Sequence, residues 1–422
     1  MSWRTSGPEH RAGVPGPQSV CRIALYSHDT MGLGHMRRNL LVAHALTTSE
    51  LSPAILLFSG KTEAGAFSLP ARADRVILPA LRKTEGGKYE PATLGVRLDD
   101  IIGVRSALIS AGLSAFDPDL LIVDNVPRGA MGELNAALTA LRARGRTRIV
   151  LGLRDVLDDP EVVRREWGRA RNEDAIDQFY DAVWIYGDPH VVDTSREYGF
   201  RRSVAEKIDF TGYFDQRRRL DFVSLDQYRA VDALRWPNGS TVLCMLGGGQ
   251  DGAPLAEALL RMKLPARWTA IVLTGPYLPT TVSNALRGRA AADERFRVLD
   301  FVSEPALLLS RVDRVISMGG YNSVSEILSF DKPALIVPRV KPRLEQWIRA
   351  DKLESLGLID VLHPDDLAAD ELSAWLARDL AHRTAIRSLI DLDGLDNIPS
   401  LARDLVSSEA VLHTPALRQV VS

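Results

Sequence analysis

Two glycine-rich turns stand where a chain could bind an anion and place a base beside it. The first, "SHDTMGLGH" at residues 27–35, follows an apolar run and ends at His35, where a helical pattern begins. The second, "GGGQDG" at residues 247–252, also lies between an apolar run and a helical pattern. Glycine lets backbone amides approach a phosphate, and a helix N-terminus adds its dipole. A turn that only needs positive φ uses fewer glycines, so we expect phosphate binding at Gly247, Gly248, Gly249 and Gln250.

His35 is the candidate general base. A helix N-terminus disfavours the protonated form of a histidine, and a neutral imidazole can take a proton from a nucleophile. Asp124 is a second candidate for this role, because it ends an apolar run and strand ends face the cleft of an open α/β sheet. Helix capping or packing is the alternative for both residues. The residues expected near the acceptor are Gly32, Gly34, Arg38 and Arg154.

The stretch "SMGGYNSVSEILSFDKPALIVP" at residues 317–338 is the most informative part of the chain. Gly320 makes a turn before a helix at 321–330, and Asn322 and Ser323 in its first turn could bind a diphosphate together with the helix amides. Glu326 follows one turn later, where a carboxylate can accept both hydroxyls of a ribose. A lone glutamate would be a solvated helix residue, but the combination favours nucleotide binding.

A further helix begins at Glu345 and Gln346, after the basic segment "PRVKPRL". These two side chains could bind the hydroxyls of a sugar. The basic residues before them fit a solvated loop equally well. The chain contains no His-x-Glu-x-x-His pattern and no closely spaced cysteine pair, so we expect a reaction that needs neither a metal nor a cofactor.

Apolar runs alternate with amphipathic segments along most of the chain, which predicts βαβ units and parallel sheets. Six strands are expected before residue 187 and five between residues 240 and 338. The predicted fold is α/β, with two Rossmann-like doubly wound domains that face each other across a cleft. The expected segments are a disordered tail (1–20), an acceptor-binding domain (21–214), a linker or hinge (215–238), a donor-binding domain (239–405) and a second tail (406–422).

Composition narrows the possible partners and the compartment. The net charge of −2 gives no reason to expect a nucleic-acid partner. No apolar run approaches the roughly 18 residues that span a membrane, and the first residues lack the apolar core of a signal peptide. We therefore expect a cytoplasmic protein with two reduced cysteines, Cys21 and Cys244. Peripheral contact with a membrane stays open.

These motifs resemble the two-domain glycosyltransferases of the B fold (GT-B). The resemblance covers roughly residues 20–405 and is strongest at 247–350, where "GYNSVSEI" precedes "PALIVP". Within that fold the chain is similar to the family 28-like group that contains the bacterial undecaprenyl-linked muramyl-pentapeptide N-acetylglucosaminyltransferase, and most similar to a bacterial branch of predicted glycosyltransferases. The resemblance implies a UDP-sugar donor bound by the second domain, with Phe301 and Val302 along the base and Glu345 and Gln346 at the sugar.

Two departures from that group limit what the resemblance implies. The group has two glutamines where this chain has Glu345 and Gln346, so N-acetylglucosamine is not assured as the sugar. The pattern Gly-x-Gly-His-x-x-Arg at residues 32–38 also resembles a nucleotide-sugar hydrolase of the same fold.

The sequence thus predicts inverting transfer of a hexose or N-acetylhexosamine from a UDP-sugar. The acceptor would be a hydroxyl of an unknown small molecule, glycan or lipid-linked compound, and the nucleotide sugar is a substrate rather than a cofactor. One alternative is a nucleotide-sugar hydrolase with water as the acceptor. Another is a nucleotide-sugar-binding protein without catalysis.

Overall fold

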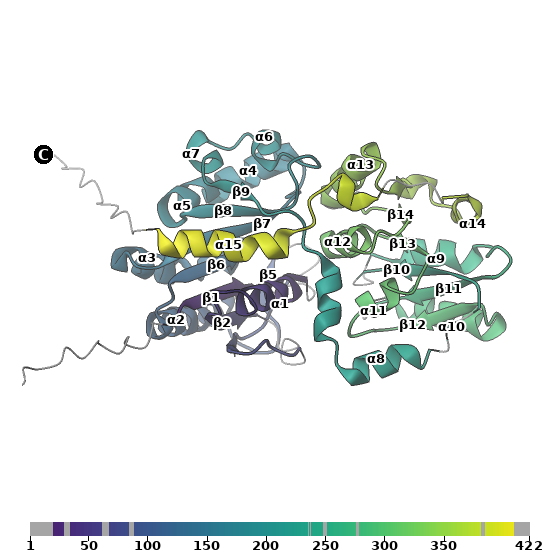
Figure 1. Cartoon of the computed structure of the whole chain (residues 1–422), viewed down its shortest axis with the longest axis horizontal. Helices are drawn as coiled ribbons and strands as arrows, with labels where there is room; N and C mark the ends of the chain where they lie inside the picture. Colours follow the sequence, from purple (N-terminus) through teal and green to yellow (C-terminus); the bar gives the residue numbers. More distant parts are fainter. Residues whose placement is uncertain are drawn as a thin grey trace, which may run out of the picture.

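Two parallel sheets, each flanked by helices, make up the fold (Figure 1). The computed structural model describes residues 20–28, 34–60, 67–83, 88–234, 236, 238–247, 251–275, 278–380 and 385–408. The first sheet has the order β3-β2-β1-β6-β7-β8-β9 and the second the order β12-β11-β10-β13-β14-β15. Strand neighbours are parallel throughout both sheets. The predicted α/β fold with two doubly wound sheets is therefore confirmed.

The first domain contains the following elements. Its sheet strands are β1 (Arg22–Ser27), β2 (Ala54–Ser59), β3 (Ala73–Ile77), β6 (Leu120–Asp124), β7 (Arg148–Arg154), β8 (Ala182–Tyr186) and β9 (Ile208–Phe210), and a separate hairpin is formed by β4 (Leu81–Lys83) and β5 (Tyr89–Pro91). Its helices are α1 (Gly34–Thr47), α2 (Leu98–Phe116), α3 (Asn135–Arg144), α4 (Pro160–Ala170), α5 (Asn172–Phe179), α6 (Thr194–Tyr198) and α7 (Arg202–Ala205), with a short turn η2 (Ala130–Gly132). The six predicted strands are present, and β4, β5 and β9 are additions.

The second domain repeats this arrangement. Its strands are β10 (Ser240–Met245), β11 (Trp268–Leu273), β12 (Phe296–Leu299), β13 (Arg314–Ser317), β14 (Ala334–Ile336) and β15 (Asp360–Val361). Its helices are α9 (Ala253–Arg261), α10 (Thr280–Ala292), α11 (Ala306–Leu309), α12 (Tyr321–Ser329), α13 (Glu345–Ser355) and α14 (Ala369–Ala377), with short turns η4 (Pro364–Asp366) and η5 (Ile386–Ser388). Among the described residues, no helix has both the length and the apolarity to cross a membrane.

The central strands are apolar on both faces because helices cover both sides of each sheet. The residues of β6 and β8 are buried along their whole length. Cys21 lies just before β1 and the buried Cys244 lies within β10, and both thiols are free, as expected.

Each sheet reverses its strand order beside its first strand. β2 and β6 flank β1, and β11 and β13 flank β10. Ligands of open α/β sheets bind outside the carboxyl ends of the strands at such a reversal. In the first sheet this point lies between the end of β1, which leads to α1, and Asp124 at the end of β6. In the second it lies between Gly247 and Gly320.

The last described helix, α15 (Gly394–Ser407), corrects one expected boundary. It falls within the stretch assigned from the sequence to the donor-binding domain, but it packs against α1 and β6 of the first sheet. Figure 1 shows it in yellow along that sheet. Its buried face includes Leu395, Ile398 and Ala402. The sequence pattern shows that one face of this helix is apolar, but it does not show which sheet that face covers.

The expected linker is largely helical. It contains η3 (Gln216–Phe222) and α8 (Leu225–Asp232). Helix α8 begins with a capping box, in which the Ser224 hydroxyl accepts from the Gln227 amide and the Gln227 side chain accepts from the Ser224 amide. Both η3 and α8 contact α11 of the second domain. The segment is therefore packed on that domain. The expected tails, 1–20 and 406–422, lie outside the described residues except for Val20 and residues 406–408, and the second tail begins later than expected because α15 continues to Ser407.

Gly152 in β7 supports a first prediction, because a Cβ atom at this position would lie 1.9 Å from the Tyr186 hydroxyl oxygen. We expect Gly152→Ala to lower the free energy of unfolding by about 1–3 kcal/mol, since overpacking a rigid core forces its neighbours to shift. Gly168→Ala in α4 is the matched control, because a Cβ there meets nothing within 4 Å. Thermal unfolding of both variants checks this, and equal losses would contradict it.

Candidate active site at the domain interface

The two helices that the sequence places after glycine turns meet at their N-termini. A Cβ atom on Gly34, the first residue of α1, would lie 2.2 Å from the side-chain nitrogen of Asn322 in the first turn of α12. Gly34 is thus one point at which the first domain touches the second. His35, the next residue, is placed beside the turn that was predicted to bind a diphosphate.

His35 and Asp124 form a hydrogen-bonded pair. The Nδ1 atom of His35 lies 2.5 Å from Oδ2 of Asp124, and their side chains are 18% and 0% exposed. Arg38 also binds this carboxylate, with its Nη2 atom 2.6 Å from Oδ1 and 2.8 Å from Oδ2, and the same atom lies 2.9 Å from Nδ1 of His35. These two partners overcome the effect of burial and hold the pKa of Asp124 well below its usual range. Asp124 is therefore an ionised acceptor that fixes the orientation of the imidazole, leaving the Nε2 atom of His35 for chemistry.

His28 is a neighbour of this pair that the sequence gave no reason to select. It lies just after β1, and its ring centroid is 4.9 Å from that of His35. It is buried, and its Nδ1 atom has no hydrogen-bond partner among the described residues. Burial lowers the pKa of His28 to about 3, and the proximity of His35 adds to the decrease. His28 is thus neutral in the folded protein.

This burial predicts an acid-sensitive fold. The unfolded chain binds a proton on His28 near the ordinary histidine pKa of about 6.5, whereas the folded chain does so only near a pKa of about 3. The neutral form of His28 therefore contributes to the free energy of unfolding, and this contribution is lost as the pH falls from about 6.5 toward 3. Between pH 7 and pH 5 the loss is about 2 kcal/mol. Urea unfolding at these two pH values should show a smaller loss for His28→Gln than for the wild type. Equal losses would contradict the assignment.

The first turn of α12 offers backbone amides at the interface. Gly320 is the N-cap and has no side chain with which to cap the helix, so among the described residues no capping side chain satisfies the free amides there. Asn322 and Ser323 are half-buried in this turn. Tyr321 is buried, and its hydroxyl donates to the backbone carbonyl of Tyr186 at 2.8 Å. The predicted diphosphate residues are thus together on one turn, and their role stays a prediction.

Glu326, the predicted ribose residue, lies in a buried group of charges. It forms an ion pair with Arg219 of η3, which also pairs with Glu304 at 2.8 Å. Arg37 of α1 adds a positive charge nearby and donates to the Ser303 carbonyl at 3.0 Å. Burial raises the pKa of Glu326, and Arg219 opposes that rise. A contact with ribose would require this carboxylate to exchange Arg219 for the hydroxyls.

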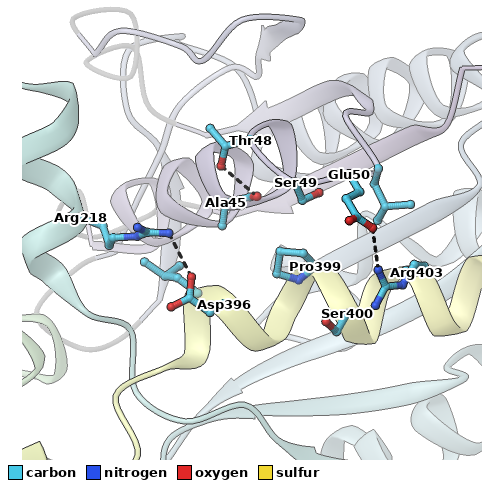
Figure 2. A pocket seen from close by; sticks show the side chains of 11 residues that line it. Ala45, Thr48, Ser49, Glu50, Arg218, Asp396, Pro399, Ser400 and Arg403 are labelled. Atoms are coloured by element: carbon cyan, nitrogen blue, oxygen red, sulfur yellow. Dashed lines mark hydrogen bonds and ion pairs between the residues drawn. The ribbon is translucent and has the colours of Figure 1, made fainter.

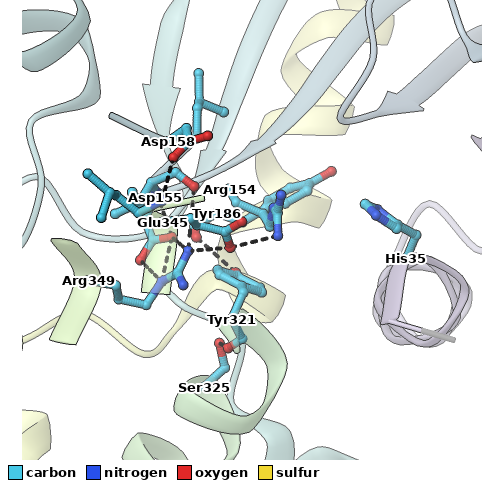
Figure 3. Close-up of polar contacts among 12 residues, drawn as sticks. His35, Arg154, Asp155, Asp158, Tyr186, Tyr321, Ser325, Glu345 and Arg349 are labelled. Atoms are coloured by element: carbon cyan, nitrogen blue, oxygen red, sulfur yellow. Dashed lines mark hydrogen bonds and ion pairs between the residues drawn. The ribbon is translucent and has the colours of Figure 1, made fainter. Parts of the chain in front are cut away.

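Glu345, the predicted sugar residue, joins the two domains. Its Oε1 atom accepts from Arg154 at 2.8 Å and from Arg349 at 3.1 Å. Arg349 in turn pairs with Asp155 at 2.8 Å, and both of these side chains are fully buried. Tyr213 donates to the second oxygen of Asp155 at 2.8 Å. Figure 3 shows this network, with His35 on α1 to one side of it.

Four remaining predicted positions have simpler surroundings. Gln346 accepts from the backbone amide of Arg339 at 3.0 Å. Phe301 is 58% exposed, and Val302 is partly buried against the core. Gly247 has a φ of 61°, in the left-handed region that a glycine adopts easily. The other predicted loop residues, Gly32, Gly248, Gly249 and Gln250, lie outside the described residues.

Aromatic and charged residues that the sequence analysis did not select complete the interface. Tyr186 ends β8, and Tyr321 begins α12. The strand-end pattern that identifies Arg154 also covers Asp155, the next residue. No sequence pattern identified Arg349, because its position in a helix does not show that its side chain contacts the other domain.

A separate cavity of about 330 Å³ lies between α1 and α15 (Figure 2). Two ion pairs border it, Arg218 with Asp396 at 3.0 Å and Arg403 with Glu50 at 3.2 Å. Of its lining residues, Ala45 is the nearest to His35 along α1. At a rise of 1.5 Å per residue, these two positions are about 15 Å apart along the helix. The cavity is therefore distinct from the His35 site.

The two doubly wound parallel sheets define the class of protein as one with the GT-B fold. The structure resembles the crystal structure of CalG4, the calicheamicin glycosyltransferase, with a TM-score of 0.57, 16% identity, and coverage of 94% of this chain and 99% of that one. It also resembles the UDP-GlcNAc 2-epimerase from Neisseria meningitidis, with a TM-score of 0.61, 12% identity, and coverage of 92% and 99%. At these identities the likeness concerns the fold alone.

Sequence comparison gives a more specific assignment for the second domain. Residues 242–388 match the glycosyltransferase family 28 C-terminal domain. This part of the chain is therefore similar to that domain, as the resemblance implied. The match includes the turn after β13 and the start of α13, where the predicted donor residues lie.

Curated relatives are similar to this chain over part of their length. The UDP-N-acetylglucosamine--N-acetylmuramyl-(pentapeptide) pyrophosphoryl-undecaprenol N-acetylglucosamine transferase of Bacillus licheniformis is 26% identical over 172 residues, which are 40% of this chain and 46% of that protein. The protein of the same name from Aquifex aeolicus is 31% identical over 144 residues, 33% of this chain and 40% of its own length. The matched region thus spans less than half of each relative.

Proposed function

We propose that this protein is a glycosyltransferase that moves a hexose or N-acetylhexosamine from a UDP-sugar to a hydroxyl acceptor. One observation carries the proposal: His35, paired with Asp124, directly follows Gly34, the residue of α1 that meets Asn322 in the first turn of α12. We propose that the base and the amides of that turn act on one substrate held between the two domains. The family 28 match at residues 242–388 supports the donor half of this assignment.

The proposed reaction is a single displacement with inversion. The Nε2 atom of His35 takes the proton from the acceptor hydroxyl while the hydroxyl oxygen forms a bond to the anomeric carbon. The bond from that carbon to the diphosphate oxygen breaks through an oxocarbenium-like transition state. The charge that develops on the leaving diphosphate is stabilised by amides at Gly247 and at the N-terminus of α12. Asp124 stabilises the imidazolium that forms.

Substrate binding in this proposal requires the domains to part. Asp124, Arg38 and Tyr321 are all buried at the interface, so the donor must enter before the domains close. Closure would then exclude water from the reacting centre. We propose that Phe301 and Val302 line the base, Glu326 binds the ribose, and Glu345 and Gln346 bind the sugar.

The donor and the acceptor are proposed at different levels of detail. The curated relatives are named for a UDP-N-acetylglucosamine donor and a pyrophosphoryl-undecaprenol acceptor, which supports a UDP-sugar here. For this chain we propose only a hydroxyl acceptor, which can be a small molecule, a glycan or a lipid-linked compound. A cytoplasmic location and a metal-independent mechanism are further parts of the proposal.

The test is a panel of UDP-, GDP- and dTDP-sugars, with nucleotide release, product mass and thermal stability measured. We expect UDP-sugars to raise the unfolding temperature without hydrolysis, and sugar transfer once a hydroxyl acceptor is added, equally with and without EDTA. His35→Ala should abolish transfer, whereas the matched control His44→Ala on the same helix should retain it. Rapid release of free sugar that depends on His35 would instead identify a hydrolase. If no donor binds, the proposal fails.

A further inference from the structure

Tyr321 belongs to the second domain, where the guanidinium carbon of Arg349 lies 5.3 Å from its ring centroid, but it also contacts the first domain. It is the first residue of α12, and it is 4% exposed. Its hydroxyl donates to the carbonyl of Tyr186 at the end of β8. The guanidinium carbon of Arg38 lies 5.4 Å from its ring centroid. Its ring centroid is also 6.5 Å from that of Tyr213.

Arg38 is enclosed by two tyrosine rings. Its guanidinium carbon lies 5.5 Å from the centroid of Tyr186, in addition to its contact with Tyr321. One ring therefore comes from each domain. A guanidinium prefers the face of an aromatic ring, and this attraction is greater when water is excluded. The side chain of Arg38 is only 3% exposed, so its orientation depends on both rings.

The same guanidinium determines the position of the Asp124 carboxylate. Three contacts join them: Nε to Oδ1 at 3.1 Å, and Nη2 to Oδ1 and Oδ2 at 2.6 and 2.8 Å. Asp124 then accepts from His35 at 2.5 Å. A continuous series of contacts thus runs from α12 of the second domain through Arg38 to the imidazole in the first. Its only member from the second domain is Tyr321.

We infer that Tyr321 is a positioning residue that aligns His35 only when α12 is docked against the first domain. The inference rests on the proposed function and deepens it, because the base is completed by the domain that binds the donor. When the domains part, Arg38 loses one of its two ring contacts and its hold on Asp124 loosens. The base is then poorly aligned while the site is open to water.

The experiment compares three variants with the wild type. Tyr321→Phe keeps the ring and removes the hydroxyl, Tyr321→Leu removes the ring, and Arg38→Lys keeps the charge but lacks the planar guanidinium. The surface control is Tyr228→Leu, since Tyr228 packs on Arg311 at 5.3 Å and is 50% exposed. Thermal unfolding of each variant verifies that it is folded.

Two measurements are made on each variant. The first is the low-field NMR resonance of the His35 Nδ1 proton hydrogen-bonded to Asp124, which is identified by its loss in His35→Ala. We expect this resonance in Tyr321→Phe and Tyr228→Leu, and its loss in Tyr321→Leu and Arg38→Lys. The second is steady-state kinetics, where Tyr321→Leu should lower kcat about 10- to 100-fold with the donor KM changed less than about threefold.

The outcomes separate this inference from the proposed function. If Tyr321→Leu keeps both the resonance and kcat, the inference is wrong while the glycosyltransferase assignment stands. If the wild type transfers no sugar, the proposed function fails, and the resonance alone still decides whether Tyr321 positions His35. If Tyr321→Leu does not fold, Arg38→Lys tests the same series of contacts from its other end. Equal loss in Tyr321→Phe would show that the hydroxyl, rather than the ring, is required.

Discussion

Replacing His35 with alanine should lower kcat by about 10²–10⁴-fold, the usual range for loss of a general base. The imidazole is held by a buried carboxylate and is itself partly exposed, with 18% of its side chain accessible. Donor binding should change little, because the predicted donor residues lie in the second domain. Steady-state kinetics for transfer and thermal shift with UDP-sugar for binding separate the two effects.

Asp124→Asn is the informative companion to this variant. An amide nitrogen facing Nδ1 of His35 would favour the tautomer with its proton on Nε2, and that tautomer cannot accept a proton from the acceptor. We therefore expect Asp124→Asn to lose activity by a factor within the same range as His35→Ala. The double variant should be no worse than either single variant, because the two residues act as a unit. Normal kcat in either single variant would contradict a role for this pair.

Asp155→Ala is expected to have the largest effect on stability, a loss of about 3–5 kcal/mol in the free energy of unfolding. Asp155 and Arg349 are both 0% exposed and come from different domains. Removing the carboxylate leaves the guanidinium buried, with Glu345 as its remaining acidic partner within 4 Å in the described part of the chain. Calorimetry is the appropriate measurement, because two-domain proteins need not unfold in one step. We also expect the two domains to unfold more independently in this variant.

Two controls distinguish a buried unpaired charge from a simple loss of packing. The double variant Asp155→Ala/Arg349→Met removes both charges and should regain much of the lost stability, since the cost comes mainly from the uncompensated arginine. Asp396→Ala breaks an exposed pair with Arg218, whose side chains are 66% and 48% exposed, and should cost less than about 1 kcal/mol. If Asp155→Ala costs no more than Asp396→Ala, the buried pair does not hold the domains together.

The sequence determined the elements of the fold and where the functional helices begin. The alternation of apolar runs and amphipathic segments identified the central strands, because each run is long enough to be buried on both faces. Glycine turns located the starts of α1 and α12, and Glu345 begins α13 as predicted. These signals are local, since the backbone requirements of a turn and a helix start are expressed in neighbouring residues. The same signals brought His35, Asp124 and Asn322 into one list of candidates.

Only the tertiary structure decided which partners these residues have. Asp155 and Arg349 are 194 positions apart, and no local pattern states that their charges meet. Glu326 lies at the expected place on its helix, but its pairing with Arg219 depends on how η3 packs on α12. The apolar face of α15 could have covered either sheet, and it covers the first. Hydrophobic periodicity indicates that one face of a helix is buried. Which sheet or side chain that face contacts depends on the shape and charge of a surface assembled from distant parts of the chain.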